Sequence, residues 1–144
     1  RPKSSAASDV YKRQRLDNMI LKNNQVMGIL DWELSTLGHP IADFSYHCLS
    51  WRTQEAFWDQ AKLKELGVPS EKEYMDMYCE NTGKDLSKNW EFYMAFNMFK
   101  IAGILQGILG RVRDGTASSK HAEDRGMMVY PLSEAAWNTI IENF

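Results

Sequence analysis

The sequence predicts a mainly α-helical fold that carries one short β-hairpin near its amino-terminal end. Two short apolar runs, at positions 16–21 and 26–32, flank polar turn formers that include Asn23 and Asn24, which is typical of a hairpin. Everything after Pro40 follows helical periodicity. With 144 residues, 44% of them apolar, the chain has the size of one domain and can bury a core without disulfides.

The first 14 residues differ in composition from the rest of the chain. They consist of a Ser/Ala segment followed by a basic stretch, and they show no sustained helical or strand period. We expect residues 1–14 to be disordered or foreign to the domain, as a cloning or read-through remnant would be. Residues 15–144 are expected to form the domain itself, as a piece of a longer protein.

The region from Pro40 to Gly83 predicts three helices. The first covers 41–51, and the second runs from about 54 to 66 and ends at Gly67 and Pro69. Ser70 opens the third with an S-x-x-E capping box. This helix should direct three side chains inward before Gly83 ends it, and these are Tyr74, Met77 and Tyr78.

The strongest helical pattern lies between Ser87, its expected N-cap, and the Asp-Gly pair at 114–115. Apolar residues cover nearly its whole circumference, which predicts the central buried helix of the fold. Three glycines within it suggest close approach of another backbone, and these are Gly103, Gly107 and Gly110. A last helical region should run to Phe144 and bend or break at Pro131.

Composition narrows the classes of partner and compartment. A net charge of -2 and a pI near 5.9 produce no overall positive electrostatic field that would attract nucleic acid or anionic membranes. The longest apolar stretch is interrupted by Gly103, Gln106 and Gly107 and falls short of the ~20 residues that a membrane span needs. Cys48 and Cys79 are too few for a disulfide framework, so we expect an intracellular protein, cytoplasmic or organellar.

Two polar residues flank the predicted hairpin. Asn18 begins the first strand and Asp31 ends the second, so antiparallel pairing should bring their side chains to the same end of the hairpin. Amide and carboxylate oxygens suit Mg²⁺, which takes one or two protein ligands and completes its shell with water and phosphates. The hypothesis is a Mg-nucleotide site, and the competing interpretation is that both are turn or cap residues.

The segments RLDNMIL and VMGILDWELSTLGHPIADFSYHCLSW closely resemble the catalytic segment of the aminoglycoside phosphotransferase and choline kinase-like family. This resemblance covers positions 15–51, and more loosely the helical remainder, including GRVRDGTASS. It is closest to the kinase-like domains fused to acyl-CoA dehydrogenases. It implies the C-terminal lobe of a protein-kinase-like fold, with ATP and Mg²⁺ as cofactors, a hydroxyl as phosphoryl acceptor, and a fused dehydrogenase domain as a partner.

The resemblance also implies roles for individual residues. Asn18 and Asp31 match the family's two metal ligands, and Asp43 matches the aspartate that braces the catalytic loop by hydrogen bonds. A plain acid at a helix N-terminus would occupy the same place as Asp43. Glu33 and His39 are secondary candidates for the cleft wall, with structural placement and local hydrogen bonds as the competing interpretations.

The sequence departs from the family at the catalytic base. The family's His-Gly-Asp triplet should occupy positions 11–13, where this chain has Tyr11, Lys12 and Arg13. A guanidinium cannot accept a proton at neutral pH, and the Gly-rich loop and strand lysine of an N-terminal lobe are also missing. We expect an inactive fragment of a phosphotransferase. The alternatives are a pseudokinase and a non-catalytic helical interaction module.

Overall fold

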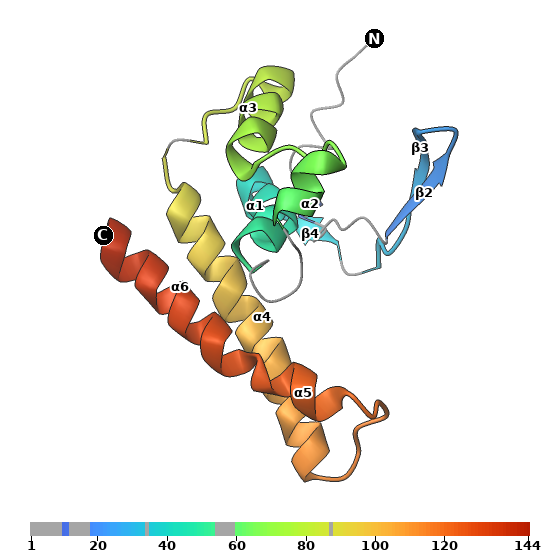
Figure 1. Ribbon diagram of the computed structural model, residues 1–144, viewed down its shortest axis with the longest axis vertical. Coiled ribbons are helices and arrows are strands. Elements are labelled where there is room, and N and C mark those ends of the chain that lie inside the picture. Colours follow the sequence, from blue (N-terminus) through green and yellow to red (C-terminus); the bar gives the residue numbers. More distant parts are fainter. Residues whose placement is uncertain (1–9, 12–17, 34, 54–59, 87) are drawn as a thin grey trace. The chain divides into compact units, whose positions relative to one another are not determined.

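The computed structural model describes residues 10–11, 18–33, 35–53, 60–86 and 88–144. It divides into two compact units, Arg1–Leu86 and Ser87–Phe144, which are considered separately below. The described residues are mainly helical and include one antiparallel β-hairpin with strands of four and five residues (Figure 1). This confirms the predicted fold class, mainly α-helical with a short hairpin. The expectation of disorder for 1–14 falls almost entirely outside the described residues. Within it, Val10–Tyr11 form strand β1, which the sequence did not predict and which pairs with β4, Thr36–Leu37.

The hairpin consists of β2, Met19–Lys22, and β3, Gln25–Ile29. Met19 lies opposite Ile29, and Lys22 lies opposite Gln25. The turn residues Asn23 and Asn24 have φ values of 51° and 58°, the left-handed pair that a tight hairpin turn requires and that asparagine tolerates. The predicted hairpin and its turn are therefore confirmed.

Helix α1, Pro40–Arg52, carries the core of the first unit. Pro40 stands at the first helical position, where its missing N–H costs nothing. The helix buries one face of small and apolar side chains, which comprises Ile41, Ala42, Ser45, Cys48 and Leu49. Burial raises the pKa of the Cys48 thiol strongly, so this cysteine is a packing residue and not a nucleophile.

Helices α2, Gln60–Glu65, and α3, Glu71–Thr82, follow α1. Both halves of the predicted capping box of α3 are present, because Ser70 Oγ accepts from the amide of Glu73 and the Glu73 carboxylate accepts from the amide of Ser70. The ends also follow the prediction, since Gly67 and Gly83 have φ values of 76° and 69°. The predicted start of the second helix at 54 lies outside the described residues.

Aromatic side chains join α1 to α3. Phe44 stacks on Tyr78 with ring centroids 3.9 Å apart, and Trp51 stacks on Tyr74 at 5.1 Å. Burial raises the pKa of both tyrosines. The expectation that Met77 also points inward is wrong, because it is half exposed; the contact with α1 is made along the narrower stripe that the two tyrosines define.

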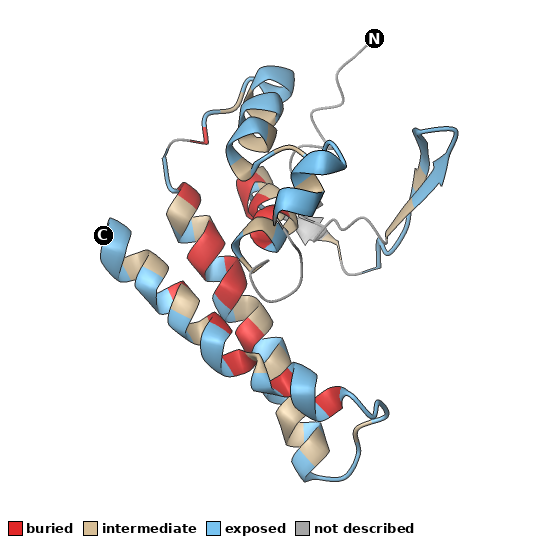
Figure 2. Cartoon of the chain, in the orientation of Figure 1, coloured by how far each residue is buried: buried red, intermediate tan, exposed pale blue. Residues whose placement is uncertain are grey.

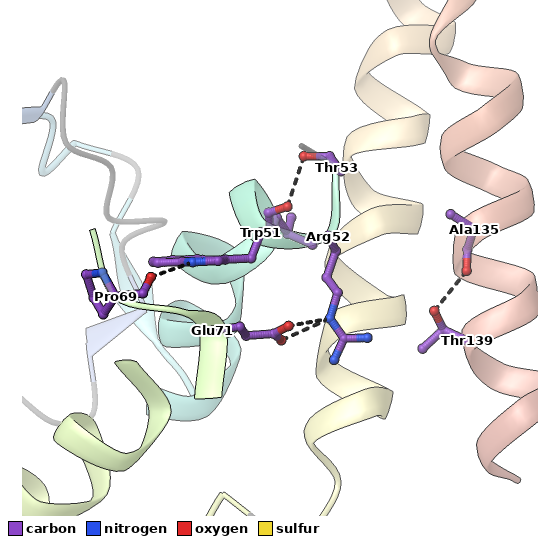
Figure 3. A network of polar contacts seen from close by, with 8 residues as sticks. Trp51, Arg52, Thr53, Pro69, Glu71, Ala135 and Thr139 are labelled. Atoms are coloured by element: carbon purple, nitrogen blue, oxygen red, sulfur yellow. Dashed lines mark hydrogen bonds and ion pairs between the residues drawn. The ribbon is translucent and has the colours of Figure 1, made fainter. Parts of the chain in front are cut away.

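Polar contacts also join α1 to α3 and to the loop before it (Figure 3). The Trp51 indole Nε1 donates to the carbonyl oxygen of Pro69 at 3.0 Å. Arg52 Nε donates to both carboxylate oxygens of Glu71, at 2.9 Å and 2.7 Å. The Arg52–Glu71 pair is a charge-assisted contact between the last turn of α1 and the first turn of α3.

The second unit consists of α4, Trp90–Arg113, α5, Ala122–Met127, and α6, Val129–Asn143. Helices α4 and α6 lie side by side (Figure 1). Their facing sides are buried and their outer sides are not (Figure 2). The buried residues of this unit are Trp90, Met94, Ala95, Asn97, Met98, Ala102, Ala122, Gly126, Val129, Leu132 and Ala136.

The prediction of a central buried helix holds for only one side of α4. Three phenylalanines on its outer side, Phe92, Phe96 and Phe99, are each nearly half exposed. The reason is that α5 and α6 cover only one side of α4 in this unit, and two helices cannot bury the whole apolar circumference of α4.

By length and composition, α4 could also cross a membrane. The core helices of soluble proteins meet the same criteria. The prediction that Ser87 caps this helix is wrong, because α4 begins at Trp90 and its N-cap is Asn89, whose side chain makes no capping hydrogen bond.

The close backbone approach expected at the α4 glycines occurs elsewhere. A methyl group placed on Gly103 or Gly110 would meet no described atom within 4 Å beyond its own stretch of helix, and one on Gly107 would meet only the Arg111 side chain, at 4.0 Å, so that interpretation is wrong. A methyl group on Gly126 of α5, in contrast, would lie 2.5 Å from Leu109 Cδ2.

The last helical region breaks at Met128, three residues before Pro131. The break arises because proline has no N–H to donate to the carbonyl of Met127, and its ring crowds that carbonyl.

Candidate functional site

The open end of the hairpin brings Asn18 and Asp31 together. Asn18 Nδ2 donates a hydrogen bond to Asp31 Oδ2 at 3.1 Å. Their backbones are joined as well, because the amide of Leu30 donates to the carbonyl of Asn18 at 2.8 Å and extends the strand ladder by one step. Antiparallel pairing of β2 with β3 thus brings together two side chains that are thirteen residues apart in the sequence, at the end of the hairpin opposite its turn.

Asp31 adopts an unusual backbone conformation at this point. Its φ is 65°, a left-handed value that aspartate tolerates better than most residues but that still costs free energy. Two bonds hold the chain in this bend: Trp32 Nε1 donates to the carbonyl of Ile29 at 2.7 Å, and the amide of Ser35 donates to the carbonyl of Trp32 at 2.9 Å. The bend ends the strand and leaves the carboxylate beside the Asn18 amide.

A small divalent cation at this point would need oxygen ligands from both side chains. Ligands of Mg²⁺ lie 2.0–2.1 Å from the ion in an octahedron, so neighbouring ligand oxygens are about 2.9 Å apart. The 3.1 Å distance between Asn18 Nδ2 and Asp31 Oδ2 is that of a hydrogen bond, in which the amide nitrogen faces the carboxylate. Turning the Asn18 amide over would present its oxygen instead. The predicted metal role of the two residues depends on that reorientation and stays a prediction.

The protein supplies few other hard ligands. Within the part of the chain that the structure describes, no group of three or more His, Cys, Asp or Glu side chains could hold a metal ion. Two protein ligands are nonetheless the usual number for Mg²⁺ that is shared with substrate phosphates. A cation held by Asn18 and Asp31 would therefore need phosphate as a further ligand, and its binding stays a prediction.

Asp43 lies in the first turn of α1 and is half-buried. Burial raises the pKa of Tyr78, and the negative charge of Asp43 nearby raises it further. The catalytic loop that Asp43 is predicted to brace would lie within 12–17, outside the described residues. Its bracing role stays a prediction, as does the absence of a base at Arg13.

The two secondary candidates have different surroundings. His39 is the N-cap of α1, and its Nδ1 accepts a hydrogen bond from the amide of Ile41 at 3.3 Å. This contact matches the local role that was the competing interpretation for His39. Glu33 is exposed in the loop after Asp31, and its role at the cleft stays a prediction.

Trp32 has no role among the predicted site residues, although its indole bond to Ile29 shapes the bend at Asp31. Its position directly after the acid was visible. The bond itself was not, because it depends on the left-handed turn at Asp31, which no apolar or polar pattern announces.

Comparison with known proteins identifies related sequences. Residues 15–78 match the sequence model of the phosphotransferase enzyme family. The chain is 40% identical over 144 residues to mouse acyl-CoA dehydrogenase family member 10, a match that covers 95% of this chain and 14% of that protein. It is 37% identical to human acyl-CoA dehydrogenase family member 11, over 83% of this chain and 16% of that protein. The chicken member 11 is also 37% identical, over 83% and 17%.

These matches confirm the resemblance on which the sequence interpretation depends, and the family implies a kinase-like fold for the matched segment. The chain spans about one-seventh to one-sixth of the length of these curated relatives. No solved structure matches it.

Proposed function

We propose, from the match of residues 15–78 to the phosphotransferase enzyme family, that this chain carries the metal-binding part of an ATP- and Mg²⁺-dependent phosphotransferase. The acceptor would be a hydroxyl group of a small molecule. The observation that supports the proposal is the 3.1 Å hydrogen bond between Asn18 and Asp31, because it brings an amide and a carboxylate, both of which offer oxygen ligands that suit Mg²⁺, to the same end of the hairpin.

The residues of the site would divide the work in the following way. Asp31 and Asn18 would hold Mg²⁺, which when bound neutralises charge on the nucleotide phosphates during transfer. Trp32 keeps the carboxylate in place through its bond to Ile29. Asp43 would position the catalytic loop from the first turn of α1, through hydrogen bonds to backbone amides that are typical of an ionised carboxylate.

The chain as written would transfer phosphate poorly. Arg13 stands where the family has its catalytic aspartate, and a guanidinium cannot orient an acceptor hydroxyl by accepting its proton. Members of the family also bind the nucleotide with an N-terminal lobe, which supplies a Gly-rich loop and a lysine. The 144 residues contain no counterpart of this lobe. We therefore propose that this chain is an inactive portion of a larger phosphotransferase.

The acceptor and the partner domain are proposed from the relatives. Three of them carry the name acyl-CoA dehydrogenase family member, so a fused dehydrogenase domain is a natural partner. A phosphotransferase joined to such a domain would act on a hydroxylated acyl group. We place the protein inside the cell, in the cytoplasm or an organelle, because its two cysteines are free.

A reconstruction experiment tests the proposed function. In the full-length protein that contains this segment, Tyr11→His, Lys12→Gly and Arg13→Asp together restore the family's triplet. ATP turnover with a panel of hydroxyl acceptors should rise by about 10²-fold or more, the usual contribution of a positioned base. The same triple variant with Asp31→Asn added serves as the control and should show no rise. Equal turnover before and after the restoration, with nucleotide still bound, would count against the phosphotransferase.

A second candidate function is a non-catalytic interaction module, which the outer side of α4 favours. Phe92, Phe96 and Phe99 are each nearly half exposed there, and the rings of Phe92 and Phe96 stack with centroids 6.4 Å apart. Contiguous exposed apolar surface of this kind marks binding sites for other proteins.

Fluorescent dye binding measures whether this surface is open in solution. The 144-residue chain should enhance the fluorescence of a dye for apolar surfaces, and Phe92→Gln, Phe96→Gln and Phe99→Gln together should remove most of the enhancement. Phe144→Gln is the matched control, because it removes one exposed phenyl group outside α4. A chain that enhances the dye no more than the triple variant would contradict the interaction module.

A further inference from the structure

A threonine with two arginines before it follows the end of α4. Thr116 lies in the loop between α4 and α5, with Arg113 three positions and Arg111 five positions ahead of it. All three residues are exposed. Nothing in the phosphotransferase proposal uses this segment.

The end of α4 presents the Thr116 hydroxyl at the surface. Gly115 has a φ of 68°, and its amide donates to the carbonyl of Val112 at 3.0 Å. The amide of Thr116 donates to the carbonyl of Arg111 at 2.8 Å. This pair of bonds is a Schellman motif, which places Thr116 at the second position beyond the helix. Its Oγ1 also donates to the Arg111 carbonyl, at the long distance of 3.4 Å, so the hydroxyl is only weakly held.

We propose that Thr116 is a phosphorylation site for an arginine-directed serine/threonine protein kinase. Kinases of this class select their substrates by charge pattern, and guanidinium groups before the acceptor suit acidic pockets on the kinase because they pair bidentately with carboxylates. The Arg113 side chain is 81% exposed. Its 3.1 Å contact with Asp114 joins two exposed side chains, a pairing too weak to compete with a pocket.

The local structure can open to meet such a kinase. A kinase binds its acceptor segment in an extended form, so the last turn of α4 must unwind. Arg111, Arg113 and Asp114 are exposed there and Val112 is half-buried, so the turn has little apolar packing to lose. Helix ends with exposed side chains and few buried contacts open at low cost in free energy.

The reaction is an ordinary phosphoryl transfer from ATP, which the kinase binds. Thr116 Oγ1 forms a bond to the γ-phosphorus while the bond from that phosphorus to the β–γ bridging oxygen breaks. The hydroxyl proton passes to the catalytic aspartate of the kinase, and ADP leaves. The product carries a charge of about −1.5 to −2 on Thr116 at pH 7.

The phosphate should loosen the end of α4. Phosphorylation removes the hydroxyl proton that Thr116 donates to the Arg111 carbonyl. It also adds negative charge at a helix C-terminus, where the backbone dipole already presents its negative end. We expect the amides of Gly115 and Thr116 to exchange hydrogen faster in the phosphorylated chain, as the Schellman bonds weaken.

The competing explanation of the arginines is structural, since cations near a helix C-terminus stabilise it through the dipole. To separate this structural role from kinase recognition, the 144-residue chain is incubated with a purified arginine-directed kinase and Mg·ATP. Intact mass should increase by one phosphate, and peptide mapping should place it on Thr116. Arg111→Gln with Arg113→Gln should slow the modification by about tenfold or more, which corresponds to loss of a charge-assisted contact.

Matched controls keep the result specific. Arg125→Gln removes an exposed arginine from α5, outside the pattern, and should leave the rate unchanged. Ser118→Ala with Ser119→Ala should also leave it unchanged, whereas Thr116→Val should abolish it. Helical content by circular dichroism verifies that each variant is folded. Absence of phosphate on Thr116, phosphate on Ser118 or Ser119 instead, or a rate insensitive to both arginines would overturn the proposal.

Discussion

Asp31→Asn should lower phosphoryl transfer about 100-fold or more in the full-length protein with its His-Gly-Asp triplet restored. The substitution keeps the size of the side chain and removes the negative charge that holds the divalent cation, whose stabilisation of the transferring phosphate is worth several kcal/mol. A loss of about 3 kcal/mol corresponds to a factor of more than 100 in rate. The measurement is ATP turnover as a function of Mg²⁺ concentration.

Asp76→Asn is the matched control for this charge change. Asp76 is an exposed acid on α3 that pairs with Lys72 at 2.6 Å, far in sequence from the hairpin, so transfer should be unaffected. If Asp31→Asn retains both the rate and the Mg²⁺ dependence of its parent, Asp31 is not a metal ligand and the role assigned to it is wrong.

Gly126→Ala should destabilise the 144-residue chain by about 1–3 kcal/mol, the range for overpacking a close contact. The new methyl group would lie 2.5 Å from Leu109 Cδ2, 2.6 Å from Leu109 Cγ and 3.3 Å from the Leu109 backbone nitrogen, so the Leu109 side chain must change its position or α5 must shift against α4. This clash outweighs the gain of up to about 1 kcal/mol that alanine brings to a helix in place of glycine. Urea denaturation followed by circular dichroism measures the free energy of unfolding.

Two further variants show whether the contact is responsible. Gly103→Ala on α4 meets no described atom within 4 Å outside its own turn, so it should leave stability unchanged or raise it slightly. Combining Gly126→Ala with Leu109→Ala removes the clashing side chain, and the double variant should lose less than the sum of the single losses. Equal effects of Gly126→Ala and Gly103→Ala would contradict the close approach of α5 to α4.

Local signals in the sequence predicted the hairpin and the capping box well. Asn23 and Asn24 tolerate the left-handed turn that joins the strands, and Ser70 with Glu73 forms a capping box from four consecutive residues. The meeting of Asn18 with Asp31 also followed from local geometry, because antiparallel pairing fixes which residues share an end. These features depend on residues that are close in sequence or in register.

Features that depend on packing between elements were harder to predict. The apolar circumference of α4 could not show that Phe92 and Phe96 would stay exposed, since that depends on how many helices surround it. The glycine pattern drew attention to Gly103 and Gly110, yet the tight contact is at Gly126, a lone glycine beside charged residues. The left-handed backbone of Asp31 has no signature in the sequence either.

Binding of a divalent cation between Asn18 and Asp31 is the most direct test of the central claim. Mn²⁺, a paramagnetic substitute for Mg²⁺, is titrated into the ¹⁵N-labelled 144-residue chain while NMR signals are followed. The Asn18 side-chain amide and the Asp31 backbone amide should broaden first, Mg²⁺ should restore them, and Asp31→Asn should abolish the effect. Signals at Asn18 that broaden no earlier than those of the exposed acids on α3, or that respond equally in Asp31→Asn, would contradict the metal site.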